Sequence, residues 1–341
     1  MTIKSAYPAA TSIIILNWNG KTDTLNCLAS VLKVDHPSFN VIVVDNGSED
    51  DSISAINKQF PNIHLIETGK NLGYAGGNNV GIQYALDNNA DYVLVLNNDT
   101  IVAADLLEQL TATAEQHPQT AAFGPVVCEM DKPDTIWTAG EFFTDIVSPV
   151  SFQQGENISS ISKQTTLDTQ WVNGAAFFVR ADIFREIGLF DEKFFLTYEE
   201  SDWCCRAQNK GYNCLVVPTA VIWHKVASSF GNESSPLRAY YSTRNKLLFV
   251  GKNRPKTHLF KLLYRLLKQS LPVLLPAKHG PQAWIKRQHW ALLASVQRWR
   301  SPLQVAFRRG IRDYLFRQFG ECPPIVLSLQ RSWLSIQRGK R

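Results

Sequence analysis

Short apolar runs alternate with amphipathic segments in the first part of the chain. The runs are rich in β-branched residues along their whole length, which is typical of strands buried on both faces of a parallel sheet. Between the first two runs, Leu25, Leu28 and Leu32 fall on one face of a predicted helix. The repeated β-α order predicts an α/β fold with a doubly wound, mostly parallel, Rossmann-like sheet flanked by helices. The predicted strands are 12–17, 40–45, 63–68, 92–99 and 121–127.

The middle of the chain is less regular. Residues 128–170 are rich in Ser, Thr, Asp and Gly, which predicts an irregular or mobile connection. Earlier in the chain, Ser48 is followed three residues later by Asp51, which resembles a capping box and predicts that a helix opens there. After the irregular part, a strand, a short helix, a second helix and a further strand are predicted in that order, at 171–180, 181–188, 198–211 and 213–224.

Charge divides the chain into two parts. Residues 252–341 contain 19 Lys and Arg but two acids, whereas residues 1–251 contain 16 Lys and Arg and 28 Asp and Glu. We therefore expect a folded domain over 1–251 and a basic helical C-terminal appendage over 252–341. Such a basic segment favours an acidic partner. No recognised nucleic-acid module accompanies the charge, so we expect an anionic membrane surface and no nucleic acid.

An amphipathic helix is predicted in this appendage, over Thr257–Ser270. Its cations Lys261, Arg265 and Lys268 fall on one face, and leucines and a phenylalanine occupy the others. This pattern suits a helix lying in the headgroup layer of an anionic membrane, although a helix that packs on the folded domain is the plainer alternative. Tryptophans follow among further basic residues, at Trp284, Trp290 and Trp299.

Cysteine usage indicates a reducing compartment, and the lengths of the apolar runs bear on export and membrane insertion. The six cysteines form no C-x-x-C pair, so they predict buried hydrophobes and neither a zinc site nor a disulfide framework. The N-terminal apolar run "SIIILN" is too short for the core of a signal peptide, and no stretch approaches the roughly 20 apolar residues of a membrane span. We expect a cytoplasmic protein, peripheral at the inner face of the cell membrane.

Polar residues follow the predicted parallel strands. Because ligands bind beyond the carboxyl ends of the strands in such sheets, we expect one shared site there. Neither G-x-G-x-x-G after the first strand nor a G-x-x-x-x-G-K-[ST] loop is present. This favours a nucleotide held by side chains, with a carboxylate placed for a divalent cation. The residues that follow the four strands are Asn17 and Asn19, Asp45, Asn71, and Asp99.

Six motifs in order resemble a known family. They are "SIIILNWNG", "VVDNGSEDDS", "NLGYAGGNN", "LNNDT", "WVNGAAFFVR" and "DEKFFLTYEESDWCCR". Together they resemble the family 2 glycosyltransferases, and most of all the bacterial rhamnosyltransferase-like branch, over residues 11–250. The resemblance implies a GT-A fold and an inverting enzyme that uses a nucleotide-sugar donor to build surface polysaccharides.

The resemblance also implies donor and metal contacts. Asp45 would accept a hydrogen bond from the pyrimidine base, with Asn17 beside the base and ribose. The D-x-D metal motif of the family reads Asn97-Asn98-Asp99 here, so one carboxylate remains where two are usual. Asp99 would bind Mg²⁺ or Mn²⁺, and His224 would be the second metal ligand. Asn97 would be at most a weak ligand. A plain Asn-Asp turn and a structural histidine are the alternatives.

The general base is expected in "YEESDW". The family pattern E-D-x-D aligns its base with Glu200, which leaves Glu199 as the second choice. Two neighbouring acids after an apolar segment raise one pKa toward that of a general base, whereas a solvated helix face is the alternative. The remaining candidate substrate-binding residues are Asn19, Asn71, Asn98, Trp171, Asn173, Gly174, Asp202 and Arg244.

Some of these candidates have a structural alternative. Trp171 could stack on a sugar ring or belong to the core, and Asp202 is expected to hold the local structure. The predicted function is inverting transfer of a sugar from dTDP-rhamnose or a UDP-sugar to a hydroxyl of a glycan or lipid-linked acceptor. The alternative is a catalytically silent protein of the same fold that binds sugar nucleotides or polysaccharide, which the incomplete D-x-D motif suggests.

Overall fold

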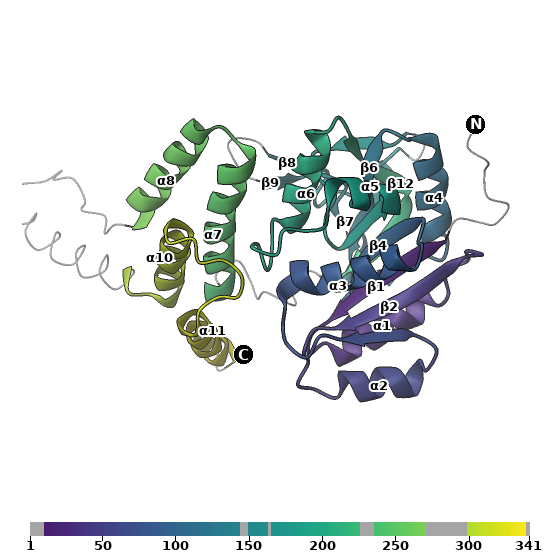
Figure 1. Ribbon diagram of the computed structural model, residues 1–341, viewed down its shortest axis with the longest axis horizontal. Helices are drawn as coiled ribbons and strands as arrows, with labels where there is room; N and C mark the ends of the chain where they lie inside the picture. Colours follow the sequence, from purple (N-terminus) through teal and green to yellow (C-terminus); the bar gives the residue numbers. More distant parts are fainter. Residues whose placement is uncertain (1–9, 144–148, 163–164, 226–234, 271–298, 339–341) are drawn as a thin grey trace, which may run out of the picture. The chain divides into compact units, whose positions relative to one another are not determined.

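The computed structural model describes residues 10–143, 149–162, 165–225, 235–270 and 299–338. The chain divides into two compact units, Met1–Ser228 and Ser229–Arg341. The first unit is an α/β structure, and the second is built from helices in the residues described (Figure 1). The tail residues Trp284 and Trp290 lie outside the described ranges.

The first half of the α/β unit has the predicted parallel order. Its strands lie in the order β4-β1-β2-β3, all parallel, and α1 and α2 cover one face while α3 covers the other (Figure 1). The elements are β1 (Thr11–Asn17), α1 (Lys21–Val31), β2 (Phe39–Asp45), α2 (Ser52–Gln59), β3 (His64–Glu67), α3 (Gly73–Asp87) and β4 (Tyr92–Asn97).

The second half extends the sheet with strands of both directions. β11 lies antiparallel between β4 and β6, and β12 continues parallel to β6. The sheet as a whole is therefore mixed. Its first half, where the site is predicted, is parallel, as expected from the sequence. The elements are β5 (Thr100–Val102), α4 (Leu106–Gln116), β6 (Thr120–Glu129), β11 (Ala176–Arg180), α5 (Ala181–Ile187), α6 (Glu199–Gln208) and β12 (Asn213–His224).

The prediction of an irregular 128–170 segment is wrong. It contains short strands that pair with the main sheet or with each other, and Ile136 and Ile161 are buried against β6 and β12. Strands of three residues carry too short a pattern to be recognised, because tertiary pairing and not local preference forms them. The elements are β7 (Lys132–Thr138), β8 (Glu141–Phe143), β9 (Pro149–Ser151), the 3₁₀ turn η1 (Ile158–Ser160) and β10 (Leu167–Thr169).

Two local predictions also differ from the structure. The strand predicted over 171–180 begins only at Ala176, so the residues before it form a connection. The capping box is wrong as well, because α2 begins at Ser52 without a side-chain cap. Ser48 instead accepts hydrogen bonds from Asn17 and from the backbone of Asn19, which ties the loop after β2 to the loop after β1.

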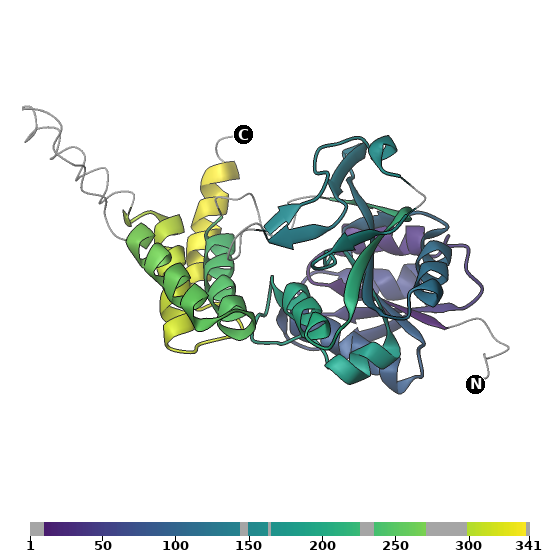
Figure 2. The ribbon, with the colours of Figure 1, turned by 90° about the horizontal axis from the view of Figure 1, so that it is seen from above.

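The core explains why the strands are apolar throughout. In β1, Ile13 and Ile15 pack into the cluster under α1, α2 and α4, and Ile14 packs into the cluster under α3, α5 and α6. Each strand residue therefore meets a helical layer on its own side, as a sheet covered on both faces requires. Figure 2 shows the same layers from a second direction.

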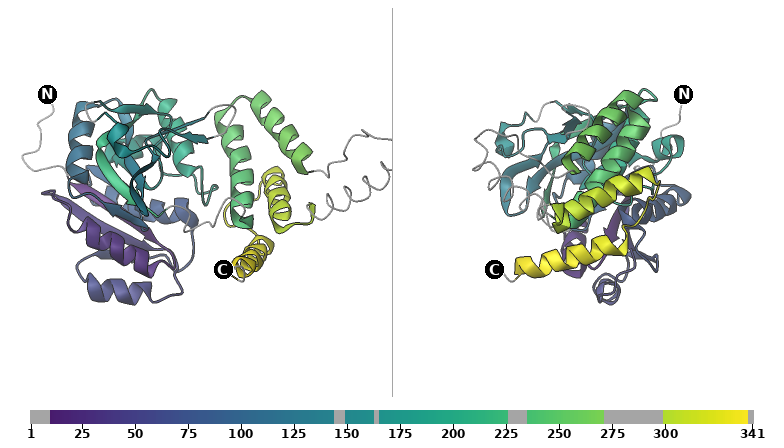
Figure 3. Two further views of the ribbon diagram at one scale, coloured as in Figure 1. Left: turned by 180° about the vertical axis from the view of Figure 1, so that it is seen from behind. Right: turned by 90° about the vertical axis from the view of Figure 1, so that its left-hand side faces the viewer.

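The second unit contains four helices in its described part, coloured green to yellow in Figure 3. Because α7 belongs to this unit, the structural division precedes the predicted boundary at residue 251, and Arg244 falls in the second unit. The functional roles assigned to the two parts remain predictions. The helices are α7 (Pro236–Asn253), α8 (Lys256–Ser270), α10 (Pro302–Leu315) and α11 (Pro324–Arg338).

The six cysteines are buried and free, as predicted. Within the described ranges, none of the helices has the length and apolar character that a membrane crossing requires.

The close approach of α3 to the sheet gives a test of the packing. A Cβ on Gly81 would lie 2.5 Å from Cγ2 of Ile14 and 3.0 Å from Cγ2 of Val44. Although alanine is favoured in helices by about 1 kcal/mol, overpacking costs about 1–3 kcal/mol. Gly81→Ala should therefore lower the free energy of unfolding in a denaturant titration. The control Gln83→Ala, at an exposed position of the same helix, should not, and equal stability of the two variants would contradict this packing.

Candidate functional site

The carboxyl ends of β4, β1 and β2 lie side by side. In the strand register, Asn97 pairs with Leu16, and Asn17 pairs with Asp45. The polar residues that follow these strands therefore share one edge of the sheet, where ligands bind in doubly wound folds.

Asp45 lies at the centre of a buried hydrogen-bond network. Its Oδ2 accepts from Nδ2 of Asn17 at 2.8 Å, and its Oδ1 accepts from the backbone N–H of Ser48 at 2.9 Å. The Asn17 amide also donates to Ser48 Oγ and accepts from Thr24 Oγ1 at 2.7 Å. Asn17 is fully buried and its polar atoms are engaged, so it orients Asp45. The Asp45 oxygens keep further lone pairs for a ligand N–H.

Asn19 and Asn71 shape turns at this edge. Asn19 has a positive φ of 52°, and its Oδ1 accepts from the backbone N–H of Glu49 at 2.7 Å. Oδ1 of Asn71 accepts from the Asn46 amide at 3.1 Å and from the backbone N–H of Gly73 at 2.8 Å. Both side chains thus hold the loops that surround the edge, which is the turn chemistry that asparagine favours.

Trp18 and Asn98 lie between these loops and α1. Nδ2 of Asn98 donates to Oγ1 of Thr24 at 2.9 Å, which ties the turn after β4 to α1. A Cβ on Gly20 would clash with this Asn98 nitrogen, so a side chain there would push the Asn98 amide away from Thr24. Trp18 is 53% exposed beside Asn17. Sequence reasoning missed Trp18, although a large apolar residue between two asparagines directly after a strand is a recognisable signal.

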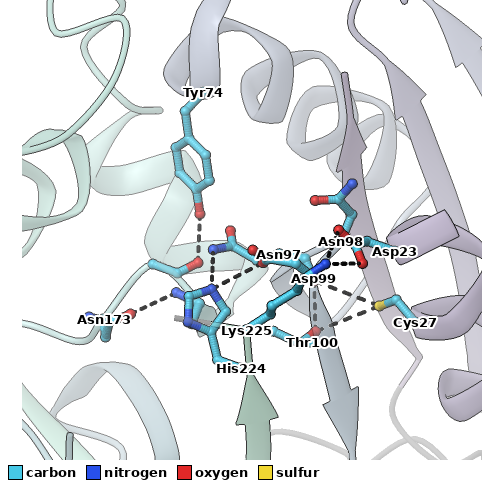
Figure 4. Close-up of polar contacts among 12 residues, drawn as sticks. Asp23, Cys27, Tyr74, Asn97, Asn98, Asp99, Thr100, Asn173, His224 and Lys225 are labelled. Carbon is cyan, nitrogen blue, oxygen red and sulfur yellow. Dashed lines mark hydrogen bonds and ion pairs between the residues drawn. The ribbon is translucent and has the colours of Figure 1, made fainter. Parts of the chain in front are cut away.

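Asp99 and His224 form a buried pair. His224 Nε2 lies 3.0 Å from Asp99 Oδ1, and Nδ2 of Asn97 lies 3.5 Å from the same His224 nitrogen (Figure 4). The Trp137 ring lies 4.9 Å from the His224 ring and supports it. His224 Nδ1 has no hydrogen-bond partner in the described part of the chain.

This pair could hold a divalent cation. A carboxylate oxygen and an imidazole nitrogen so close together are both acceptable ligands of Mn²⁺, and the carboxylate suits Mg²⁺. Among the described residues, no group of three or more His, Cys, Asp or Glu side chains could bind a metal. A cation here would need its other ligands from water or from the phosphates of a bound molecule, which is usual for Mg²⁺.

Glu199 and Glu200 open α6. Burial raises the pKa of Glu199 well above its usual value, and the charge of Glu200 raises it further. Burial also raises the pKa of Glu200, but hydrogen bonds from Glu199 and from the backbone of Gly174 oppose that rise. Of the two carboxyl groups, Glu199 therefore holds a proton more strongly than Glu200. One oxygen of each, Oε2, has no partner among the described residues.

The connection before β11 faces this pair. Nδ2 of Asn173 donates to Glu141 Oε1 at 3.1 Å, and the Gly174 carbonyl accepts from the Tyr74 hydroxyl at 2.7 Å. Trp171 is only 5% exposed and its ring lies 4.1 Å from that of Phe143, so the core alternative accounts for its position.

Glu141 and Tyr74 are site residues that sequence reasoning missed. Glu141 is buried, and its pKa is raised by burial and by the charge of Glu200. It lies on a three-residue strand in the segment predicted to be irregular, where no signal marked it. Tyr74 lies within the quoted "NLGYAGGNN" motif, so it could have been noticed there.

Two predicted residues lie elsewhere. Asp202 is fully buried and pairs with Arg206 at 3.1 Å, which agrees with the expected structural role. Arg244 is fully buried in the second unit, where it donates to the Gly320 carbonyl and to Asn245 Oδ1 and lies over the Tyr241 ring. The substrate-binding role of Arg244 remains a prediction.

Known proteins resemble the chain in sequence and in fold. It is 26% identical over 254 residues to the dTDP-rhamnosyl transferase RfbF of Shigella flexneri, covering 70% of this chain and 79% of that protein. It is 26% identical over 236 residues to the N-acetylglucosaminyl-diphospho-decaprenol L-rhamnosyltransferase of Mycobacterium tuberculosis, with 63% and 76% covered. A mannosyltransferase from Pyrobaculum calidifontis, solved with GDP-Man and Mn²⁺, superposes with a TM-score of 0.54 at 16% identity, covering 92% and 89%.

The structural likeness confirms the GT-A fold. In addition, the family model described as glycosyl transferase family 2 matches residues 12–188, more than half of the chain. The matched range contains the sheet edge with Asp45 and Asp99 and ends directly after α5. The chain therefore belongs to glycosyl transferase family 2.

Proposed function

We propose that this glycosyltransferase transfers a sugar, with inversion, from a nucleoside-diphosphate donor to a hydroxyl of a glycan or lipid-linked acceptor in cell-surface polysaccharide synthesis. The observation that carries the proposal is the buried Glu199–Glu200 pair at the start of α6, in which burial and the charge of Glu200 raise the pKa of Glu199 well above its usual value. In this proposal, Glu199 holds a proton and Glu200 is the ionised base. The printed names of two relatives support rhamnose as the sugar, with dTDP-rhamnose as the first donor to test and a UDP-sugar as the second.

Asp45 would recognise the base of the donor. Its carboxylate is oriented by Asn17 and Ser48 and can accept a further hydrogen bond from the N–H of a thymine or uracil ring. Trp18, which follows Asn17 in the chain, offers an exposed aromatic face on which a base could stack. These contacts would select the base of the donor nucleotide. Selection of the sugar would depend on other residues of the site.

Asp99 and His224 would hold Mg²⁺ or Mn²⁺, with Asn97 beside them. When bound, the cation would supply positive charge that stabilises the departing diphosphate. The protein then has to deliver the acceptor and remove its proton. In the proposed step, Glu200 takes the proton of the acceptor hydroxyl as its oxygen bonds to the anomeric carbon, while the bond to the diphosphate oxygen breaks. Glu199 keeps its own proton throughout and donates a hydrogen bond to Glu200.

The second unit would dock on an anionic membrane. On α8, Leu262 and Leu266 are buried within the unit, whereas Phe260, Tyr264 and Leu267 are 67%, 72% and 43% exposed. The cations Lys261, Arg265 and Lys268 lie one position further along the helix and are also exposed. An exposed stripe of apolar residues beside a stripe of cations favours a helix that lies in the headgroup layer over a helix that packs only against protein.

The metal assignment predicts linked binding. Mn²⁺ should tighten the binding of dTDP by about tenfold or more, which corresponds to about 1.4 kcal/mol. Asp99→Asn should remove this gain because the cation loses its carboxylate ligand. Titration calorimetry with Mn²⁺ and with a chelator measures both. The control Asp105→Asn, at an exposed acid before α4, should keep the gain. Equal affinity with and without metal would instead favour the alternative of a plain turn at Asn97-Asn98-Asp99.

The base assignment predicts a difference between two neighbouring variants. Glu200→Gln cannot accept a proton, so kcat should fall by about 10²-fold or more while the Kd for dTDP is unchanged. Glu199→Gln keeps a neutral hydrogen-bond donor and should have a much smaller effect. Release of dTDP from dTDP-rhamnose, measured with an acceptor extract, gives both rates.

The pH dependence belongs to the same test. Glu200 acts only when ionised and burial raises its pKa, so kcat should fall on acidification at a higher pH than an exposed glutamate would give. If Glu199→Gln is the inactive variant and Glu200→Gln is active, the base is Glu199. If neither variant changes the rate, the silent binding protein becomes the better interpretation.

Membrane docking predicts co-sedimentation with phosphatidylglycerol vesicles, weak binding to phosphatidylcholine vesicles, and release by high salt. Each cation near the surface contributes about 1 kcal/mol, so Lys261→Glu with Lys268→Glu should weaken binding by at least roughly tenfold. The control Lys58→Glu, on an exposed position of α2, should bind as the wild type does. Full-length protein that ignores anionic vesicles would leave α8 as a packing element.

A further inference from the structure

Tyr74 contacts both segments that position Glu200. It is the second residue of α3, and its backbone N–H donates to the Phe195 carbonyl at 2.6 Å. Its hydroxyl donates to the Gly174 carbonyl at 2.7 Å. Figure 4 shows this hydroxyl directed toward the segment that carries Asn173, in the same region as Asp99 and His224.

Gly174 connects the Tyr74 hydroxyl to the carboxylate. The Gly174 backbone lies close to the Glu200 carboxylate, and its polar group lowers the pKa of Glu200. A Cβ on Gly174 would lie 3.1 Å from Tyr74 Oη and 3.5 Å from Glu200 Oε1. The hydroxyl, the glycine backbone and the carboxylate are therefore packed against one another with little space between them.

The segment before Glu199 is strained and is held by the start of α3. Phe195, Thr197 and Tyr198 have φ values of 62°, 69° and 74°, in a region that non-glycine residues rarely adopt. Each such residue costs about 1–3 kcal/mol and persists only where the surroundings hold it. The Phe195 carbonyl accepts from the N–H groups of both Tyr74 and Ala75, two of the amides that a helix start leaves unpaired.

We propose that Tyr74 is a positioning residue for the general base: its hydroxyl fixes the Gly174 backbone so that this backbone stays against the Glu200 carboxylate. This proposal rests on the proposed role of Glu200 as the base. It adds a residue that acts on the reaction through Gly174 and not through contact with the reacting atoms.

Tyr74 remains a donor at every relevant pH. Burial raises the pKa of Tyr74 well above its usual value, and the charges of Glu200, Glu199 and Asp99 add to this. The groups that face Glu200 are Glu199 and Tyr198 from α6 and the residue before it, Tyr74 from α3, and Glu141 from β8. Of these, only Tyr74 also donates to the Gly174 backbone.

Loss of the hydroxyl therefore has a defined effect on the base. Without the Tyr74 donor, the Gly174 carbonyl loses its buried partner and the segment can shift away from Glu200. The Gly174 backbone then stabilises the charged carboxylate less, so the pKa of Glu200 rises. The acidic fall of kcat should move to higher pH, because Glu200 is protonated earlier on acidification.

The experiment measures Tyr74→Phe in the full-length protein. We expect kcat to fall by about tenfold, in keeping with one lost buried hydrogen bond, and its acidic fall to move to higher pH. The Kd for dTDP should not change, because Asp45 and its partners are untouched. The control is Tyr84→Phe on the same helix, whose ring stacks on His64 at 4.2 Å. It should change none of these quantities.

Two further variants separate positioning from a general structural effect. Gly174→Ala inserts a methyl group between the hydroxyl and the carboxylate, so it should move the acidic fall in the same direction as Tyr74→Phe. Adding Tyr74→Phe to Glu200→Gln should cause no further loss, because the variants act on one unit. A Tyr74→Phe variant with an unchanged pH profile, or with losses that multiply with those of Glu200→Gln, would overturn the proposal whatever its Tm.

The outcomes also separate this proposal from the proposed function. If Glu200→Gln keeps full activity, the base assignment fails and the positioning role falls with it. If Glu200→Gln is inactive while Tyr74→Phe behaves as the wild type does, the base assignment stands and only the role of Tyr74 is wrong.

Discussion

The sheet of the first unit is buried on both faces, and this constraint decides where polar chemistry can occur. In β1, Ile13 and Ile15 face one helical layer and Ile14 faces the other, so the strand has no side free for a ligand. A polar group placed along the strand would cost several kcal/mol without a partner. Polar residues are confined to the strand ends, and the parallel order of β4, β1 and β2 brings Asn17 and Asp45 to one edge.

The acids at this edge and in the adjacent segments have different surroundings. Asp45 accepts hydrogen bonds from Asn17 and Ser48, and Asp99 lies against an imidazole. Glu199 and Glu200 are neighbours in a buried site, where burial raises both pKa values and the charge of Glu200 raises that of Glu199 further. Hydrogen bonds from Glu199 and Gly174 favour charge on Glu200. In the proposed reaction, donor recognition, cation binding and proton removal are therefore assigned to different acids.

Sequence patterns predict strands and helices with a clear hydrophobic periodicity, and polar residues that directly follow such strands. The parallel half of the sheet and the residues Asp45 and Asp99 belong to this class. The short strands of 128–170 do not, and Glu141 on β8 was missed for that reason. The predicted ligand roles of Asn17 and Asn71 illustrate a different limit. Residue type and position placed them at the site correctly, but only the structure shows that neighbouring protein groups occupy their side chains.

The asparagine at 97 is understandable in terms of charge. The Tyr74 hydroxyl lies within the electrostatic reach of Asp99, Glu199 and Glu200 together. In the proposed reaction, a carboxylate at 97 would add another negative charge to this group. That charge would raise the pKa of Glu200 further and keep more of the base protonated at neutral pH. His224 can serve as the second ligand without adding charge. A neutral residue at 97 is therefore compatible with catalysis, and the departure from D-x-D does not by itself favour a silent protein.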